Sequence, residues 1–281
     1  MQILRSTAHS YELITDWGIP PEKQSFKESA AVAVDAKDNV WVFNIPTNEL
    51  LIFDSDGNLL NIWPHKYENI HGIDFDSSGN VYLVNRNAHQ ILKYTINGDL
   101  IMSLGQSECP SETGYSLQIG RDTNWKNPVS HAGGPFNVPS GVRVAQNGDI
   151  YVSDGYANCQ IHRFSMDGKL IYSWGSPGKT KSSEFHLIHG LFIDSQNRIL
   201  VCDRMNNRIQ IFDLTGKFVG IYSGLAMTSK IHETPDGDFV ITEHAGRISI
   251  IDFKGNILAR WGKADGSVNK SGSGDFRKPH G

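Results

Sequence analysis

The chain has 281 residues, of which 39% are hydrophobic and 10% aromatic, so it can bury a substantial core. Its formal net charge is −4 and its Lys and Arg residues form no block, which argues against nucleic acid or an anionic membrane as a partner. The sequence contains no apolar run long enough to span a membrane and no secretory signal at its start, so we expect a cytoplasmic protein. The three cysteines have no CxxC spacing, which argues against a disulfide framework and leaves only a Cys109–Cys159 pair open.

Near the start, residues 11–18, YELITDWG, resemble the last strand of a repeat whose earlier strands are absent. Five full repeats follow and align column by column, with their first strands opening at Ala30, His71, Ser140, His189 and Ser229. Each repeat begins with two alternating apolar runs around a polar turn, as in HGLFIDSQNRILVC, which is typical of a β-hairpin. A second hairpin follows, as in NRIQIFDLTGKFVGIYSG. Repeats of about forty residues with this pattern predict an all-β propeller whose blades are four-stranded antiparallel sheets.

The end of the chain, KPHG, resembles the opening of another repeat at His280. Propellers commonly combine strands from both ends of the chain in one blade, which removes free sheet edges. We therefore predict one domain over residues 1–281, a six-bladed β-propeller with a closing strand at 11–18 and a sixth blade, from residue 280, that is incomplete in this chain.

Two other features concern packing and loops. Trp63, Trp174 and Trp261 each lie near the close of a repeat and are predicted to pack in the core or between blades. The connection from 106 to 139 is much longer than the other links between blades. Its Trp125 and His131 would suit a lid over one face, and decoration without a role is an equal alternative.

Histidine alternates with small residues in the column that opens each first strand: Ala30, His71, Ser140, His189, Ser229 and His280. First strands line the channel of a propeller, so alternate blades place equivalent side chains about a third of a turn apart at one height. Three neutral imidazoles with one open position form the arrangement of a catalytic zinc site. We therefore predict a site for Zn²⁺, or another divalent metal, at His71, His189 and His280. The alternative is that each ring only bonds backbone groups at the channel mouth.

The loops between second and third strands surround the same face, because antiparallel strands return there. Within these loops Tyr156 and Arg204 are best suited to chemistry, since a phenol can move a proton and a guanidinium can hold a carboxylate. We predict both as catalytic residues. Weaker candidates of the same type are Arg86, His89, Glu243 and His244.

The run FNVPSGVRVAQNGDIYVSDGYANCQIHRFSMDGKLIYSWG, the HG openings and VCDRMNNRIQIF together resemble NHL-repeat propellers of the peptidylamidoglycolate lyase family, and the similarity spans nearly the whole chain. The resemblance implies a catalytic zinc on the three histidines, an active-site tyrosine at Tyr156 and a substrate-binding arginine at Arg204. It implies cleavage of the C–N bond of a peptidyl-α-hydroxyglycine or similar carbinolamide, which gives an amide and glyoxylate.

Three positions depart from that family's pattern. A second substrate-binding arginine corresponds here to Ile45. The family's structural calcium would use the backbone carbonyls of Val32 and Ile73, but the place of its aspartate ligand is taken by Gly281. The cysteine that follows the family's tyrosine is Ala157, so the family's disulfide is not expected.

Two further functions compete with a zinc lyase. A metal-dependent hydrolase or lactonase would act on the same face, although such enzymes usually use carboxylate ligands and the column offers none. A non-enzymatic NHL-repeat interaction module would bind a protein partner without metal, and Ile45 favours that alternative. For either enzyme we expect a small-molecule or peptide substrate.

Overall fold

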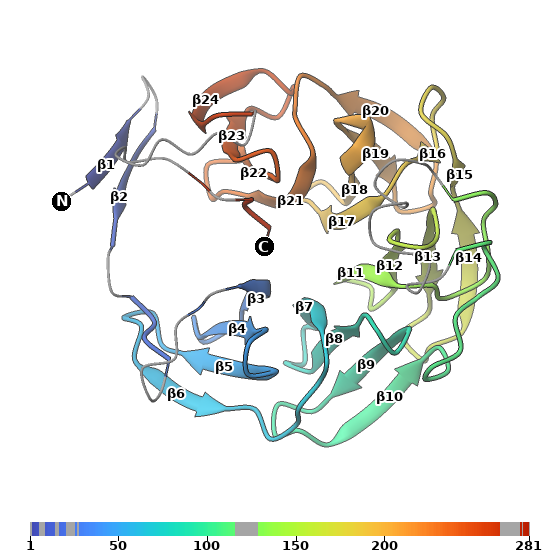
Figure 1. Ribbon diagram of the computed structural model, residues 1–281, viewed down its shortest axis with the longest axis horizontal. Helices are drawn as coiled ribbons and strands as arrows, with labels where there is room; N and C mark the ends of the chain where they lie inside the picture. Colours follow the sequence, from blue (N-terminus) through green and yellow to red (C-terminus); the bar gives the residue numbers. More distant parts are fainter. Residues whose placement is uncertain are drawn as a thin grey trace.

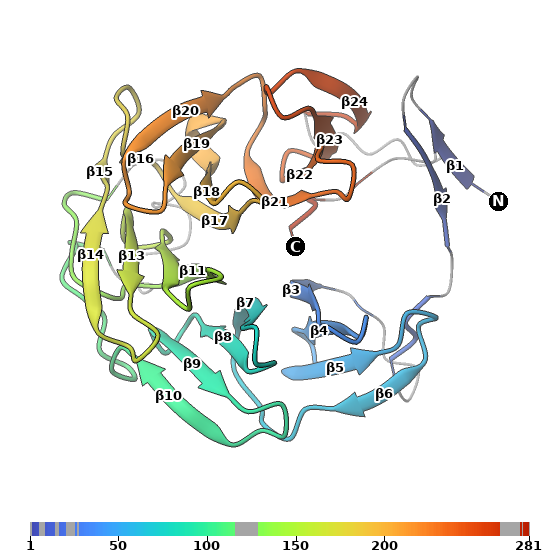
Figure 2. The same cartoon turned by 180° about the vertical axis from the view of Figure 1, so that it is seen from behind.

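The computed structural model describes residues 2–5, 9–14, 17–20, 26, 28–115, 129–264, 276 and 278–280. Within these residues, five four-stranded sheets stand in a ring around a central channel (Figures 1 and 2). The first strand of each sheet faces the channel and the fourth lies at the rim (Figure 1). The prediction of an all-β propeller built from hairpin pairs is therefore confirmed.

The strands of each blade follow one another in sequence. Blade one contains β3 (Ser29–Val34), β4 (Val40–Asn44), β5 (Glu49–Phe53) and β6 (Leu59–Ile62). Blade two contains β7 (Ile70–Phe75), β8 (Val81–Asn85), β9 (Gln90–Tyr94) and β10 (Leu100–Leu104). Blade three contains β11 (Pro139–Val144), β12 (Ile150–Asp154), β13 (Gln160–Phe164) and β14 (Leu170–Trp174). Blade four contains β17 (Ile188–Ile193), β18 (Arg198–Asp203), β19 (Arg208–Asp213) and β20 (Phe218–Tyr222). Blade five contains β21 (Thr228–Glu233), β22 (Phe239–Glu243), β23 (Arg247–Ile251) and β24 (Ile257–Gly262).

Three short elements complete the described secondary structure. A parallel pair, β15 (Ser176–Pro177) and β16 (Glu184–Phe185), lies between blades three and four, and a 3₁₀ turn, η3 (Arg204–Asn206), joins β18 to β19. The hairpin of β1 (Gln2–Arg5) and β2 (Ser10–Leu13) forms a two-stranded sheet of its own. No helix among the described residues is long and apolar enough to cross a membrane.

The turn residues of the repeats explain the tight hairpins. In blade one, Oδ1 of Asp35 accepts hydrogen bonds from the backbone N–H groups of Lys37 and Asn39 at 2.8 and 3.0 Å. The aspartates of other repeats, such as Asp194 and Asp252, cap their turns in the same way. An aspartate that bonds its own turn backbone fixes the connection between two strands. Each innermost strand begins one residue before its predicted opening.

The N-terminal hairpin lies between blade five and blade one in the ring (Figure 1). The ring of Tyr11 in β2 packs edge-on against Trp261 of β24, with 5.6 Å between centroids. Further along, Nε1 of Trp17 donates to the carbonyl of Ser55 in blade one at 2.9 Å. The expected closing segment at 11–18 therefore contacts both neighbouring blades, but only Ser10–Leu13 forms its strand, and that strand pairs with β1.

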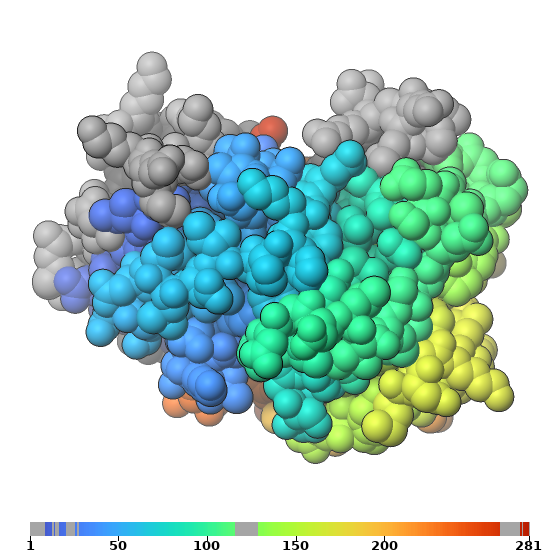
Figure 3. All heavy atoms as spheres, turned by 90° about the horizontal axis from the view of Figure 1, so that it is seen from below, coloured from blue at the N-terminus to red at the C-terminus, as the bar shows by residue number. Residues whose placement is uncertain are grey.

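Aromatic side chains fill the spaces between blades. Trp63 and Trp174 are buried, as expected of packing residues, and Trp261 is half-buried. Seen from below, the blue atoms of blade one and the cyan to green atoms of blade two lie side by side (Figure 3). All three cysteines are free thiols, so no Cys109–Cys159 disulfide forms.

The long connection between blades two and three packs on the loop that follows β12. Thr113 donates its hydroxyl proton to the carbonyl of Ala157, and the side-chain amide of Asn137 donates to the carbonyl of Ser111 at 2.9 Å. His131 is exposed, and Trp125 lies outside the described residues. The described parts of this connection therefore support the strand-connecting loop of blade three.

Replacing Trp41 with alanine tests the packing between blades one and two. Its indole is 2% exposed and lies 5.1 Å from the ring of Trp63 and 5.3 Å from that of Phe75 in β7. We expect Trp41→Ala to lower the free energy of unfolding by about 3–5 kcal/mol in urea denaturation. Leu60→Ala, at an outer-strand residue that is 54% exposed, should change it by less than about 0.5 kcal/mol. Equal losses in the two variants would contradict this account of the core.

Candidate metal centre

A β-bulge opens every innermost strand and determines where its second residue points. In β17 the pairing with β18 shifts between Ile188 and Gly190, so His189 lies within the irregularity. The pairing of β7 with β8 shifts in the same way across His71. A bulged residue leaves the regular ladder, and its side chain is aimed in a new direction. The histidine column of the sequence is therefore the column of bulged residues.

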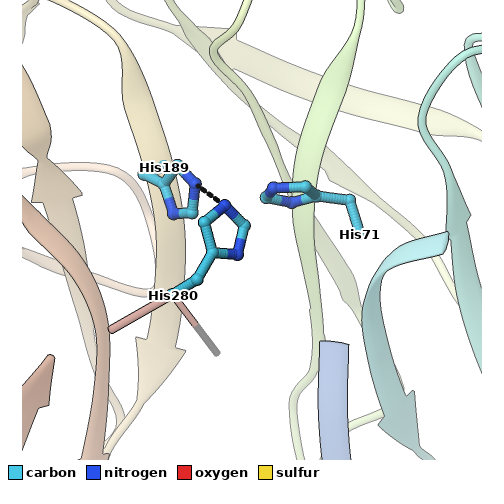
Figure 4. A group of neighbouring side chains, drawn as sticks. All are labelled: His71, His189 and His280. Carbon is cyan, nitrogen blue, oxygen red and sulfur yellow. Dashed lines mark hydrogen bonds between the residues drawn. The ribbon is translucent and has the colours of Figure 1, made fainter. Parts of the chain in front are cut away.

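The structure brings His71, His189 and His280 together at the channel axis. Their ligand nitrogens all lie within 4.8 Å of one another, and the Nε2 atoms of His189 and His280 are 3.0 Å apart (Figure 4). His71 and His189 are buried, and His280 is half-buried. Strands β7 and β17 supply two of the rings, and the segment after blade five supplies the third.

Backbone carbonyls fix the tautomers of two of the rings. Nδ1 of His71 lies 2.7 Å from the carbonyl oxygen of Ser140, and Nδ1 of His189 lies 3.1 Å from that of Ser229. A carbonyl oxygen only accepts, so each Nδ1 carries the proton, and in a neutral ring Nε2 then holds a lone pair. Each partner carbonyl belongs to the column residue of the next blade. This is the outer-sphere arrangement that orients histidine ligands of a metal ion.

The hydroxyl of Tyr156 lies between the two Nε2 atoms. It is 3.0 Å from Nε2 of His71 and 2.8 Å from Nε2 of His189. A phenol has one proton to donate, so it can satisfy only one of these two lone pairs. Three ring nitrogens that lie within 4.8 Å of one another offer the donor set of a divalent metal, and nitrogen donors of this kind suit zinc.

Gly155 is the backbone feature that allows Tyr156 to approach His189. A Cβ atom at Gly155 would lie 2.0 Å from the carbonyl oxygen of Ile188, so any other residue would push the loop away from β17. The backbone N–H of Tyr156 donates to the carbonyl of Val138 at 3.3 Å, which holds the loop from the other side. The DGY sequence therefore positions the phenol by close backbone packing.

Two guanidinium groups lie beside the phenol. Arg86, which follows β8, places its guanidinium carbon 4.0 Å from the centroid of the Tyr156 ring. Arg204, at the start of η3, donates from Nη2 to Oγ of Ser229 at 2.8 Å, and Tyr156 also interacts with its guanidinium. Oγ of Ser229 in turn donates to the carbonyl of Pro279 at 3.1 Å. This chain of bonds connects Arg204 to the segment that carries His280.

Arg204 is fully buried, with an exposed fraction of 0%. The sequence predicts that Arg204 holds the carboxylate of a substrate, and in the structure its guanidinium faces Ser229 and Tyr156 instead of solvent. Burial lowers the pKa of Arg204 to about 10, so it remains a cation at neutral pH. Its place in the structure is that of a support for Tyr156 and for the His280 segment.

The weaker candidates divide between the centre and the scaffold. Arg86 belongs to the centre, and the ring of His244 lies 6.1 Å from that of His280. Glu243 instead pairs with Arg247, and Nδ1 of His89 accepts the backbone N–H of Val138. Both are therefore structural, and so is Ile45, which packs against the core of blade one.

The carbonyls expected to bind calcium lie deeper in the channel. The carbonyl oxygen of Ile73 already accepts a hydrogen bond from Nη1 of Arg143 at 3.2 Å. A guanidinium in that position repels a cation, and Gly281, at the place of the aspartate ligand, lies outside the described residues. The residues around Val32 and Ile73 therefore do not fit a calcium ion.

Burial keeps the rings of the centre neutral. The pKa values of His71 and His189 lie well below 6.5 because burial disfavours the charged rings, and the charges of neighbouring cations add to the effect. Burial, and then the charge of Arg204, lowers the pKa of His280 to about 2. Neutral imidazole is the form that binds a metal, so the centre stays in its ligand form well into the acid range.

Lys230 is a charged residue of the channel that is not among the site residues predicted from the sequence. Its Nζ donates to the carbonyl of Ser140 at 3.3 Å, and that oxygen also accepts from His71. Burial, reinforced by the charge of Arg143, lowers the pKa of Lys230 to about 7. The alignment of repeats could have pointed to Lys230, because the column that follows the histidine column holds glycine or alanine in all the other repeats.

Comparisons with known proteins agree with this architecture. A family model described as a 6-bladed beta-propeller matches residues 135–240. NHL repeat-containing protein 3 of Homo sapiens is 30% identical over 257 residues, which cover 84% of this chain and 68% of that protein. A probable peptidyl-alpha-hydroxyglycine alpha-amidating lyase of Caenorhabditis elegans is 31% identical over 145 residues, 50% of this chain and 36% of that protein.

Solved structures agree at the level of fold. A streptogramin B lyase covers 83% of this chain and 68% of its own with a TM-score of 0.59 at 17% identity, which supports the fold alone. Fold and site together define a β-propeller with a buried three-histidine centre at its channel. The chain belongs to the NHL-repeat family. Its resemblance to amidating lyases is borne out by relatives of about 30% identity.

The neutral rings make the stability of the metal-free protein depend on pH. In the unfolded chain histidines titrate near 6.5, whereas His71 and His189 resist protonation in the folded chain, so the unfolded chain binds more protons below that pH. The contribution of these two neutral rings to the free energy of unfolding is therefore fully present above about pH 6.5 and is lost as the pH falls. These two rings should contribute up to about 2.7 kcal/mol per pH unit to that loss in urea denaturation.

The double variant His71→Asn/His189→Asn keeps a donor near each Nδ1 position but removes both titrating groups. We expect a shallower slope of its free energy of unfolding against pH, because about two fewer protons are taken up on unfolding. Identical slopes for the variant and the parent chain would contradict the neutral state of the buried rings.

Proposed function

We propose that this chain is a zinc-dependent lyase that cleaves the C–N bond of a peptidyl-α-hydroxyglycine or a similar carbinolamide, releasing an amide and glyoxylate. The observation that carries the proposal is the convergence of three imidazoles at the channel axis, two of which lie within hydrogen-bond distance of the Tyr156 hydroxyl. Amidating lyases among the relatives supply the reaction class.

The three Nε2 atoms would hold the metal, which when bound supplies a Lewis acid for the carbinol oxygen. Tyr156 is the group placed to move a proton there. As the C–O bond gains double-bond character, the phenol oxygen takes the proton of the carbinol hydroxyl and passes its own proton to the nitrogen, which receives the electrons of the breaking C–N bond. One proton is transferred from oxygen to nitrogen, and the products are the amide and an aldehyde.

The arginines support this role of Tyr156. A cation over the ring, from Arg86, and a second at the phenol, from Arg204, stabilise negative charge as it develops on the hydroxyl oxygen. Because both are buried, their fields act through little water and are correspondingly strong. In this proposal Arg204 is a positioning residue that holds Tyr156 and, through Ser229, the His280 segment.

A second candidate function is a protein interaction module without catalysis. The observation that favours it is the similarity to NHL repeat-containing protein 3, which covers more of the chain than the similarity to the lyases. A hydrolase or lactonase at the same centre would need the metal as well. Metal content and products therefore separate the three functions.

Elemental analysis of the purified full chain should find about one zinc per chain. The triple variant His71→Ala/His189→Ala/His280→Ala should contain almost none, whereas His131→Ala, at an exposed histidine of the long connection, should retain it. Equal zinc in the triple variant and the parent chain would refute both metal-dependent functions.

Replacing Tyr156 with phenylalanine removes the proton carrier and keeps the ring. We expect the rate of glyoxylate release from a peptidyl-α-hydroxyglycine to fall by about 10²- to 10⁴-fold, with the zinc content unchanged. Arg204→Lys, which keeps a charge but loses the planar fork, should lower kcat with a smaller effect on KM. Full activity of Tyr156→Phe would contradict the mechanism, and hydrolysis of a lactone without glyoxylate release would favour the hydrolase.

A further inference from the structure

A cavity lies in the channel below the three histidines. It has a volume of about 520 Å³ and is bounded by the innermost strands of all five blades, with His71 at one end. Most of its wall is apolar and includes Val34, Phe75, Val144, Phe192 and Ile231. The volume and the mixture of apolar walls with a few polar groups are typical of small-molecule sites.

The charged groups of this cavity are unbalanced. Arg143 in β11 and Lys230 in β21 contribute two cations. The carboxylate of Asp74 is already engaged, since Oδ1 lies 3.3 Å from Nη1 of Arg143 and Oδ2 accepts the backbone N–H of Val144 at 2.7 Å. The pKa of His232 in the wall is lowered by burial and by Arg143, so its ring adds no positive charge at neutral pH. A positive charge remains at Lys230.

The ammonium group of Lys230 has unused hydrogen-bonding capacity. It has three N–H donors, and in the described part of the chain it makes one hydrogen bond, to the carbonyl of Ser140 at 3.3 Å. Gly190 leaves room for this side chain, because a Cβ atom there would lie 2.9 Å from Cδ of Lys230. A cation with free donors in an apolar cavity is stabilised by an anionic acceptor.

We propose that the channel cavity binds a small organic anion, a carboxylate with a short apolar tail. The carboxylate bonds the ammonium of Lys230, and the tail lies against the apolar wall formed by residues such as Phe192 and Ile231. The site adjoins the histidine centre through the Ser140 carbonyl, which both Lys230 and His71 bond, but its binding groups are Lys230 and the deeper wall. Its occupant is an anion instead of a divalent cation, in agreement with the guanidinium on the carbonyl of Ile73.

Calorimetric titration of the metal-free full chain with hexanoate tests this proposal, and hexan-1-ol is the neutral probe of equal chain length. At about pH 6.5 the carboxylate is ionised and the ammonium is favoured over the free amine. We expect hexanoate to bind at least about tenfold more tightly than hexan-1-ol, because only the anion gains the charge-assisted hydrogen bond. Removal of metal excludes binding of the probe to an ion on the histidines.

Three variants locate the site. Lys230→Met should weaken hexanoate binding at least about tenfold and leave hexan-1-ol binding unchanged, whereas Lys66→Met, at a lysine whose side chain is 72% exposed, should change neither. Val34→Trp, at a residue of the cavity wall that is 56% exposed, should block both probes by filling the cavity, even if Lys230→Met does not fold.

The proposal is overturned if the parent chain does not bind hexanoate, if both probes bind equally, or if Val34→Trp binds hexanoate as the parent does. None of these results depends on lyase activity, so failure of this proposal leaves the proposed reaction standing.

Discussion

The hydrogen bond from a histidine Nδ1–H to the backbone carbonyl of the next blade is the interaction on which the centre depends. It joins His71 to Ser140 and His189 to Ser229, and it sets both tautomers. Each accepting carbonyl is itself at a β-bulge, so one irregularity of the strand both aims an imidazole and presents the acceptor for its neighbour. The geometry of the centre is thus set by backbone groups of the innermost strands.

Much of this fold could be predicted because one pattern is repeated. The alternation of apolar residues and the Asp-capped turns specify hairpins locally, and five copies leave little freedom in how they assemble. The convergence of His71, His189 and His280 followed from their shared column. The hairpin of β1 and β2 could not be predicted, because residues 2–5 lie outside the repeat and gain their strand by pairing with β2.

The environment of side chains was harder to predict than their position. The sequence placed Arg204 at the correct loop, but its orientation toward Ser229 and Tyr156 results from packing between β18 and β21, which no local pattern encodes. Lys230 shows the converse case, since its departure from a column of small residues was visible in the repeats. Its meaning depends on the cavity around it, and a cavity is a property of the assembled ring.

The three imidazoles come from blade two, blade four and the segment that follows blade five. Within the described residues, Ser229 of β21 bonds that last segment at the carbonyl of Pro279. A ligand shared by all three rings would join parts of the polypeptide that lie far apart in the sequence. A ligand bound at the centre would therefore stabilise the closed ring, because part of its binding free energy would oppose opening of the propeller. The rate of proteolysis near the C-terminal segment would report whether the ligand is bound.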